Sequence, residues 1–223
     1  MSTPQASREQ VAQLVRSALY AKLGRPLPAG GAVPTLVVNS SARHMHITQE
    51  NLELLFGEGY QLGVHKWLYQ EGQFASTETV TLIGPRKRII PNLRILGPTR
   101  NLTQVELAFT DAVQLGIDVP VRMSGDIEGT PGAYIMGPKG MIEMPDGVIR
   151  AARHVHMGPS DAEFYGVRHK DVMKLKVTAD KCTTVFDDLL VRVDESFKLE
   201  VHIDTDEANA SDLAHARKVE LLR

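Results

Sequence analysis

The chain contains one short phrase twice, and this repeat constrains the possible folds more than any other feature. Residues 41–47 read Ser-Ala-Arg-His-Met-His-Ile, and residues 151–157 read Ala-Ala-Arg-His-Val-His-Met. The shared core is Ala-Arg-His-x-His, with apolar residues at x and after the second histidine. In an extended segment alternate side chains share a face, so each histidine pair points one way and the apolar residues point the other. The repeat therefore predicts two similar strands, each with two imidazoles on its polar face.

The surroundings of the two copies are also alike. Residues 35–40 predict a strand before the first copy, and Thr48 is placed to cap a short helix over residues 49–56 that ends at Gly57. After the second copy, Pro159 starts a helix that continues over residues 160–165 and ends at Gly166. Both copies thus read as strand, His-x-His, short capped helix and glycine, which indicates an internal duplication.

Short β-strands dominate the rest of the chain. Three expected strands end at Gly-Pro turns, and three more follow the second copy. They are residues 78–83, 94–96, 133–136, 172–177, 185–193 and 198–203. Residues 206–216 read as a short terminal helix. Long helices alternating with strands are absent from the sequence pattern, so we expect a mainly β fold, a small barrel or sandwich, rather than a doubly wound α/β fold.

An amphipathic helix is expected over residues 7–24, before this β region. Ser7 and Gln10 form a capping box, and Gly24 and Pro26 end the helix. Its apolar stripe consists of Val11, Leu14, Val15, Ala18, Leu19 and Leu23. Residues 25–34 are rich in Pro and Gly and read as a linker. The helix either docks on its own domain or serves as a partner-binding or targeting tag.

Composition excludes several classes of function. The 223 residues allow one domain or two small ones, and 43% hydrophobic with 23% charged residues is typical of a globular protein. A net charge of −2 and 5% aromatic residues give no reason to expect nucleic acid as a partner. We expect no membrane span and no signal peptide. The single cysteine, Cys182, excludes an intrachain disulfide and fits a reducing compartment.

The histidine pattern points to metal. Half of the eight histidines lie in the repeated phrase, and four neutral imidazoles could form one metal site. His202 lies on one face of an alternating segment with Glu200 and Asp204, and Glu106 lies in a similar extended segment. Five histidines and one carboxylate could instead form two three-ligand sites with open positions, the pattern of catalytic zinc. The isolated histidines are expected at the surface: His65, His169 and His215.

Other candidates concern anions and nucleophiles. Arg100 follows the turn at residues 97–99, and its guanidinium could hold a phosphate, with Ser124 as a further donor. Arg43 and Arg153 flank the histidine pairs. For each arginine taken alone, a solvated or carboxylate-paired surface position is the alternative. Cys182 has no activating partner nearby in the sequence and is expected to be inert.

Taken together, these phrases resemble the PduL-type phosphate propanoyltransferase (phosphotransacylase) family over residues 35–210. The matching segments are residues 38–46, 72–75, 94–100, 104–106, 124–126, 137–140, 152–157 and 202–209. The resemblance implies two small closed six-stranded β-barrels with short capping helices. One would combine residues 35–42 with 152–223, the other would be residues 43–151, and residues 1–34 would be the amphipathic targeting helix and linker.

The resemblance also implies a site with two zinc ions. His44, His46 and Glu106 would hold one ion, and His154, His156 and His202 the other. Other divalent metals suit the same ligands. Arg100 would be the catalytic arginine, and Arg100 and Ser124 would bind phosphate. Coenzyme A, as a substrate, would lie at Ser41, Lys66, Arg94, Leu96 and Asn209.

The implied reaction interconverts acyl-CoA plus phosphate with acyl phosphate plus CoA, by direct attack of zinc-bound phosphate on the thioester. Propanoyl-CoA and acetyl-CoA are both possible substrates. Two other readings remain: a zinc-dependent hydrolase that uses metal-bound water, and a non-catalytic metal-binding scaffold. Some family members carry an N-terminal encapsulation helix. The resemblance therefore implies a cytoplasmic homodimer in the lumen of a bacterial microcompartment, bound to shell or core proteins through residues 7–24.

Overall fold

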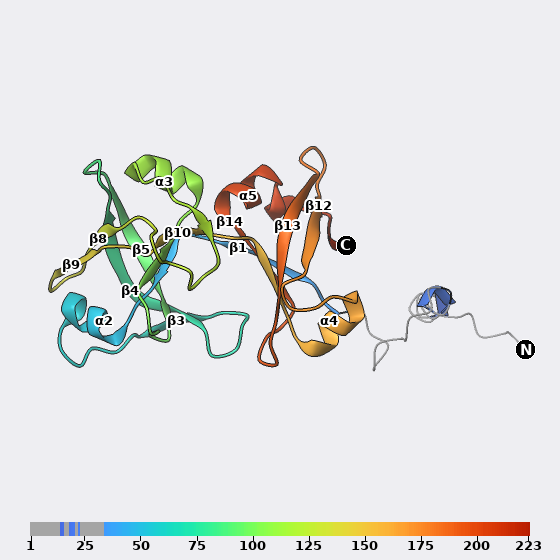
Figure 1. Cartoon of the computed structure of the whole chain (residues 1–223), viewed down its shortest axis with the longest axis horizontal. Helices are drawn as coiled ribbons and strands as arrows, with labels where there is room; N and C mark the ends of the chain where they lie inside the picture. The colour runs from blue at the N-terminus through green and yellow to red at the C-terminus, as the bar shows by residue number, and fades with distance from the viewer. Residues whose placement is uncertain (1–13, 16–17, 21, 23–33) are drawn as a thin grey trace, which may run out of the picture.

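The structure is a computed structural model that describes residues 14–15, 18–20, 22 and 34–223. It is mainly β, as the sequence predicts, with two curled sheets side by side along the long axis of the molecule (Figure 1). Described residues of the predicted N-terminal helix are helical at 14–15, 18–20 and 22. The rest of that helix and residues 25–33 of the linker lie outside the described residues, so both stay predictions. Within the described residues no helix is long and apolar enough to cross a membrane.

The first sheet has nine strands in the order β7-β10-β6-β2-β5-β4-β8-β9, with β3 paired to β4. Its strands are β2 (His44–His46), β3 (Val64–Trp67), β4 (Phe74–Ile83), β5 (Ile89–Gly97), β6 (Gln104–Glu106), β7 (Val121–Arg122), β8 (Ala133–Met136), β9 (Met141–Met144) and β10 (Val148–Ala151). Two helices belong to this half, α2 (Gln49–Phe56) and α3 (Phe109–Leu115). The nine strands exceed the six that the resemblance implies, because short strands such as β3, β7 and β9 extend the sheet.

The second sheet has six strands in the order β1-β14-β11-β13-β12-β15. They are β1 (Val37–Ser41), β11 (His154–Met157), β12 (Val172–Thr178), β13 (Thr184–Val193), β14 (Glu200–Asp204) and β15 (Lys218–Leu222). The helices of this half are α4 (Pro159–Tyr165), α5 (Thr205–Ala210) and a 3-10 turn, η1 (Leu213–His215). Strand pairing among the described residues leaves β1 and β15 at the edges, so closure of the barrels stays a prediction.

Each sheet curls around its own apolar core. Met45, Ile95 and Val105 are fully buried in the first core, and Val155 and Val201 in the second. Met45 and Val155 are the apolar residues between the paired histidines, so the alternation expected from the sequence is confirmed. Burying these side chains on one side of the strand holds the histidines on the other.

The chain exchanges strands between the two sheets. β1 pairs in parallel with β14 in the six-stranded sheet, yet it leads directly into β2 of the nine-stranded sheet. β10 pairs in parallel with β6 in the nine-stranded sheet and leads directly into β11 of the six-stranded sheet. Each Ala-Arg of the repeated phrase is therefore a crossover, which places the two histidine pairs at the seam between the sheets.

The short helices follow the sequence signals at most positions. Thr48 caps α2 by accepting a hydrogen bond from the Asn51 amide at 3.2 Å, and Pro159 begins α4. The predicted helix over residues 206–216 is wrong in its length. α5 ends at Ala210. Asp212 has a φ of 49°, and because a residue in this left-handed conformation cannot continue an α-helix, the helix does not extend into η1. Strand β15 and helix α3 were not expected from the sequence.

Candidate metal and anion site

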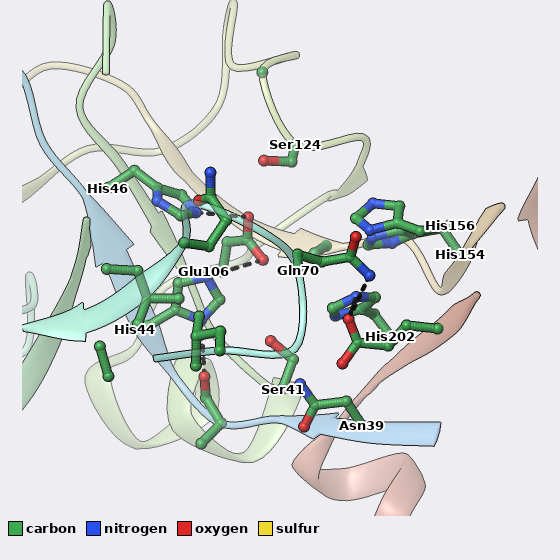
Figure 2. A pocket seen from close by; sticks show the side chains of 18 of the residues that line it. Asn39, Ser41, His44, His46, Gln70, Glu106, Ser124, His154, His156 and His202 are labelled. Atoms are coloured by element: carbon green, nitrogen blue, oxygen red, sulfur yellow. Dashed lines mark hydrogen bonds and ion pairs between the residues drawn. The ribbon is translucent and has the colours of Figure 1, made fainter. Parts of the chain in front are cut away.

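Two groups of three potential metal ligands face each other across the seam. In each group a histidine pair lies on one strand and the third ligand on its antiparallel neighbour. His44 on β2 is opposite Glu106 on β6, and His154 on β11 is opposite His202 on β14. Within each group one ligand atom per residue lies within 4.8 Å of the others: His44, His46 and Glu106; His154, His156 and His202. Figure 2 shows the two groups pointing into one pocket.

The first histidine of each pair has a fixed tautomer. His44 Nδ1 lies 2.8 Å from the Ala42 carbonyl, and His154 Nδ1 lies 2.8 Å from the Ala152 carbonyl. A carbonyl oxygen only accepts, so Nδ1 must donate its proton and Nε2 keeps a free lone pair. The hydrogen bond fixes the orientation of the ring and leaves Nε2 available to a metal, as is usual for metal-binding histidines. The alanine of the repeated phrase thus contributes through its backbone.

Three of the imidazoles are held neutral. Burial, with a further contribution from His44, lowers the pKa of His46 to about 3. Burial and the neighbouring His202 lower the pKa of His154 to about 4, and burial with His154 lowers the pKa of His156 to about 2. Burial opposes ionisation of Glu106, but the adjacent His44 and His46 keep its pKa below the usual value. Neutral imidazole and ionised carboxylate are the forms that ligate metal.

Several buried nitrogens in the two groups have no hydrogen-bond partner in the part of the chain that the structure describes. They are His46 Nδ1, both ring nitrogens of His156 and His202 Nε2. His202 Nε2 nevertheless lies 3.0 Å from Glu200 Oε2. Buried polar atoms without partners are costly, and a divalent cation would satisfy them. The donor sets therefore fit the two zinc ions that the sequence resemblance implies.

Ion pairs anchor both crossovers. Arg43 Nη1 lies 2.8 Å from Asp111 Oδ1 at the start of α3. Arg153 Nε lies 2.6 Å from Glu207 Oε1 at the start of α5. These arginines were candidates for anion binding, but the structure places them in pairs with carboxylates instead. Each pair fixes the residue immediately before a potential metal ligand.

Both ligand groups open on one cavity of about 940 Å³. Arg100 lines it and donates from Nη2 to Gln73 Oε1 at 3.1 Å. Ser124 also lines it, and Gln104 Nε2 donates to both Ser124 Oγ at 2.9 Å and Glu106 Oε1 at 2.7 Å. The structure therefore brings Arg100 and Ser124 to the same space as the ligand groups, with Gln104 orienting Ser124 against Glu106.

The residues expected to contact coenzyme A divide into two sets. Ser41, Arg94 and Leu96 line the cavity. Lys66 on β3 and Asn209 on α5 are exposed and lie outside the cavity lining. Three of the five are thus brought together at the cavity wall, and two are not.

Sequence reasoning missed further residues at this site. Gln70 is buried between the two groups, donates to Glu200 Oε2 at 2.7 Å, and accepts from the Lys198 amide at 3.1 Å (Figure 2). Arg192 on β13 also lines the cavity. Glu200 carried a signal, since it shares a face with His202 in the alternating segment. Gln70 carried none, because it reaches across from a loop distant in sequence.

Comparisons with known proteins bear on this geometry. The family model described as phosphate propanoyltransferase matches residues 37–214. A phosphate propanoyltransferase of Planctopirus limnophila is 53% identical, covering 97% of this chain and 92% of that protein. That of Thermotoga maritima is 54% identical over 80% of this chain and 84% of its own length, and that of Salmonella typhimurium 41% identical over 92% of each.

The chain belongs to the phosphate propanoyltransferase family. The resemblance inferred from the repeated phrase and its partner motifs is thereby confirmed. As a member of that family the protein is an acyltransferase enzyme, which sets aside the non-catalytic scaffold. All six potential metal ligands, Arg100 and Ser124 lie inside the segment that matches the phosphate propanoyltransferase model.

Proposed function

We propose that the protein interconverts acyl-CoA plus phosphate with acyl phosphate plus CoA. One observation carries this proposal: two three-ligand groups, Arg100 and Ser124 open on a single cavity in a chain of the phosphate propanoyltransferase family. The cavity volume of about 940 Å³ is of the size that accommodates a large substrate such as acyl-CoA.

In the forward direction a phosphate oxygen attacks the thioester carbonyl carbon, and a carbon–oxygen bond forms. The carbon–sulfur bond then breaks, and the thiolate of CoA leaves with the electron pair. Arg100 donates hydrogen bonds to the phosphate and Ser124 adds a hydroxyl donor, which together orient the attacking oxygen. Zinc ions held by the two ligand groups would supply positive charge that offsets the negative charge of the phosphate and of the developing oxyanion.

No covalent acyl-enzyme is needed. Cys182, the single thiol of the chain, is exposed and lies outside the cavity lining. The thiolate of CoA is a good leaving group, so acid assistance from a side chain contributes little. Gln104 keeps Ser124 aimed at the cavity, and Gln73 holds Arg100 until phosphate replaces it as the acceptor.

We further propose that coenzyme A lies along Ser41, Arg94 and Leu96, with Lys66 and Asn209 reached by its more distant parts. We also propose that residues 35–42 with 152–223, and residues 43–151, form two closed barrels. The separate apolar cores support this division.

Residues 7–24 are proposed as an encapsulation helix for a bacterial microcompartment, acting through shell or core proteins, and the protein as a homodimer. Fusing residues 1–34 to a fluorescent protein in cells that make the shell tests encapsulation. A diffuse signal would count against it. Light scattering in solution tests the dimer.

One assay tests the reaction. Propanoyl-CoA or acetyl-CoA is supplied with and without inorganic phosphate, and release of free thiol is followed together with metal content. The transferase predicts phosphate-dependent release. Release without phosphate would indicate a hydrolase that uses zinc-activated water. Arg100→Gln should keep its metal but lose about 100-fold in turnover, as expected for removing a charge-stabilising donor. Arg88→Gln, which removes an exposed arginine in a distant turn, is the matched control.

A further inference from the structure

Four arginines line the cavity, and three of them already have partners. Arg43 pairs with Asp111, Arg94 donates to the Ser76 and Thr77 carbonyls, and Arg100 donates to Gln73. The fourth is Arg192. Its guanidinium forms no hydrogen bond or ion pair with any residue of the part of the chain that the structure describes. Of the four arginines, Arg192 is therefore the one whose hydrogen-bond donors are free to bind an anion.

The pairing of β13 with β11 places the Arg192 side chain beside the second ligand group. On β13 it stands directly opposite His156 of β11, so the two side chains lie on the same face. The Phe197 ring stacks on His156 at 4.1 Å, and the Arg192 guanidinium lies 5.7 Å from the centre of that ring. The nearby Asp194 carboxylate accepts through Oδ1 from both the amide and the hydroxyl of Ser196, and it forms no ion pair with Arg192 in the described part of the chain.

Arg192 shares this space with Arg100, which lies in the loop after β5 of the other half. Burial lowers the pKa of Arg100, and the like charge of Arg192 adds to this effect while the Glu106 carboxylate opposes it. Arg100 and Arg192 both line the one cavity, so their like charges repel each other across it. A multiply charged anion between them would remove this repulsion and offset their loss of solvent.

We propose that Arg192 binds the phosphoryl group together with Arg100, the two guanidiniums contacting it from the two halves of the molecule. This inference rests on the proposed function and adds a specific phosphate-binding residue to it. Guanidinium suits the task because its planar donors match phosphate oxygens in pairs. The same contact serves inorganic phosphate in one direction and the phosphoryl group of acyl phosphate in the other.

The test compares Arg192→Gln with Arg192→Lys, and with Arg168→Gln as a control. Arg168→Gln removes the same charge from an exposed position in the same half. Metal-loaded proteins are titrated with inorganic phosphate by calorimetry, and KM is measured for phosphate and for acyl-CoA. Loss of a charged hydrogen-bond donor should weaken phosphate binding by about 10- to 100-fold in Arg192→Gln. KM for acyl-CoA and metal content should stay at the wild-type values, and Arg192→Lys should lie in between.

Unchanged phosphate affinity in Arg192→Gln would overturn the inference. So would a loss confined to acyl-CoA, which would place the diphosphate of CoA at Arg192, or a loss of metal, which would make Arg192 a structural residue. Failure of the proposed function looks different. In that case the wild-type protein itself would bind no phosphate and would release thiol without it.

Discussion

In the half built on β2 and β6, Arg43 pairs with Asp111 alone, whereas in the half built on β11 and β14, Arg153 shares Glu207 with Arg150. Arg150 lies on β10 of the nine-stranded sheet and reaches Glu207 at 2.7 Å and Asp204 at 2.5 Å in the other sheet. At the positions equivalent to Arg150 and Asp204, the first copy has Ser40 and Ala108. One crossover therefore carries a buried ionic connection between the sheets that the other lacks.

The ligand groups differ in charge as well. The first contains the carboxylate of Glu106, whereas the second consists of three histidines. A divalent ion in the second group would have no carboxylate among these three ligands, so more of its charge would act on a bound anion. Arg192 lies beside this second group. The two groups thus have similar frames but differ in their charged residues.

The largest expected effect comes from removing one ligand from each group. His44→Ala and His154→Ala should each lose one of the two proposed metals and about 10³-fold in turnover, the size expected for a lost electrostatic contribution to catalysis. Metal analysis and the thiol assay measure this. His65→Ala, which replaces an exposed histidine, is the control. Full activity in a variant that lacks one metal would contradict the role given to both groups.

Breaking the ionic connection should be the next largest effect. Arg150→Ala leaves the buried Asp204 without its partner and Glu207 with one partner fewer, which should lower the free energy of unfolding by about 3–5 kcal/mol. Ser40→Ala at the equivalent position of the first copy should change it by less than about 0.5 kcal/mol. Urea denaturation of both variants makes the comparison. Equal stabilities would show that the connection does not hold the sheets together.

Acid should destabilise the metal-free protein. His46, His154 and His156 have pKa values of about 3, 4 and 2 when folded, whereas an unfolded histidine titrates near 6.5. Below pH 6.5 the unfolded chain therefore takes up more protons, and stability falls by about 1.4 kcal/mol per pH unit for each such histidine. Above pH 6.5 these residues leave stability unchanged.

Denaturation at pH 7.5 and pH 5.0 checks this expectation and compares the two groups. Replacing His154 and His156 together by Asn should remove about twice as much of the pH dependence of the free energy of unfolding as His46→Asn removes. The reverse order would mean that the first group holds its imidazoles neutral more strongly than the second.

The smallest effect is expected for Gln70→Ala. Gln70 connects the loop before β4 to Glu200 and Lys198, and Glu200 lies against His202. Loss of such an outer contact should lower metal affinity by about 10-fold in the second group and leave the first group unchanged. Competition with a chelator measures this, with exposed Gln61→Ala as the control. An equal loss from both groups would indicate general unfolding.

Much of the site was predictable from local sequence. The repeated His-x-His with buried Met45 and Val155 fixes two strands and their polar faces, since alternation is a property of the extended backbone. Capping residues likewise predicted α2 and the start of α4. The third ligand of each group could also be predicted from the sequence, because Glu106 and His202 lie in short alternating segments. Residues 206–216 were mistaken for one helix because Asp212 in a left-handed conformation has no strong sequence signature.

The sequence by itself determined the family, the mainly β fold and the ligand candidates, because motifs and alternation are local properties of the chain. Only the tertiary structure decided that the repeated Ala-Arg marks two strand crossovers. It also decided that Arg43 and Arg153 are ion-pair anchors rather than anion ligands, and that Gln70 and Arg192 belong to the cavity. These facts depend on which distant strands pair, as when β11 aligns His156 with Arg192. Pairing is set by the packing of the two cores, and no window of the sequence contains it.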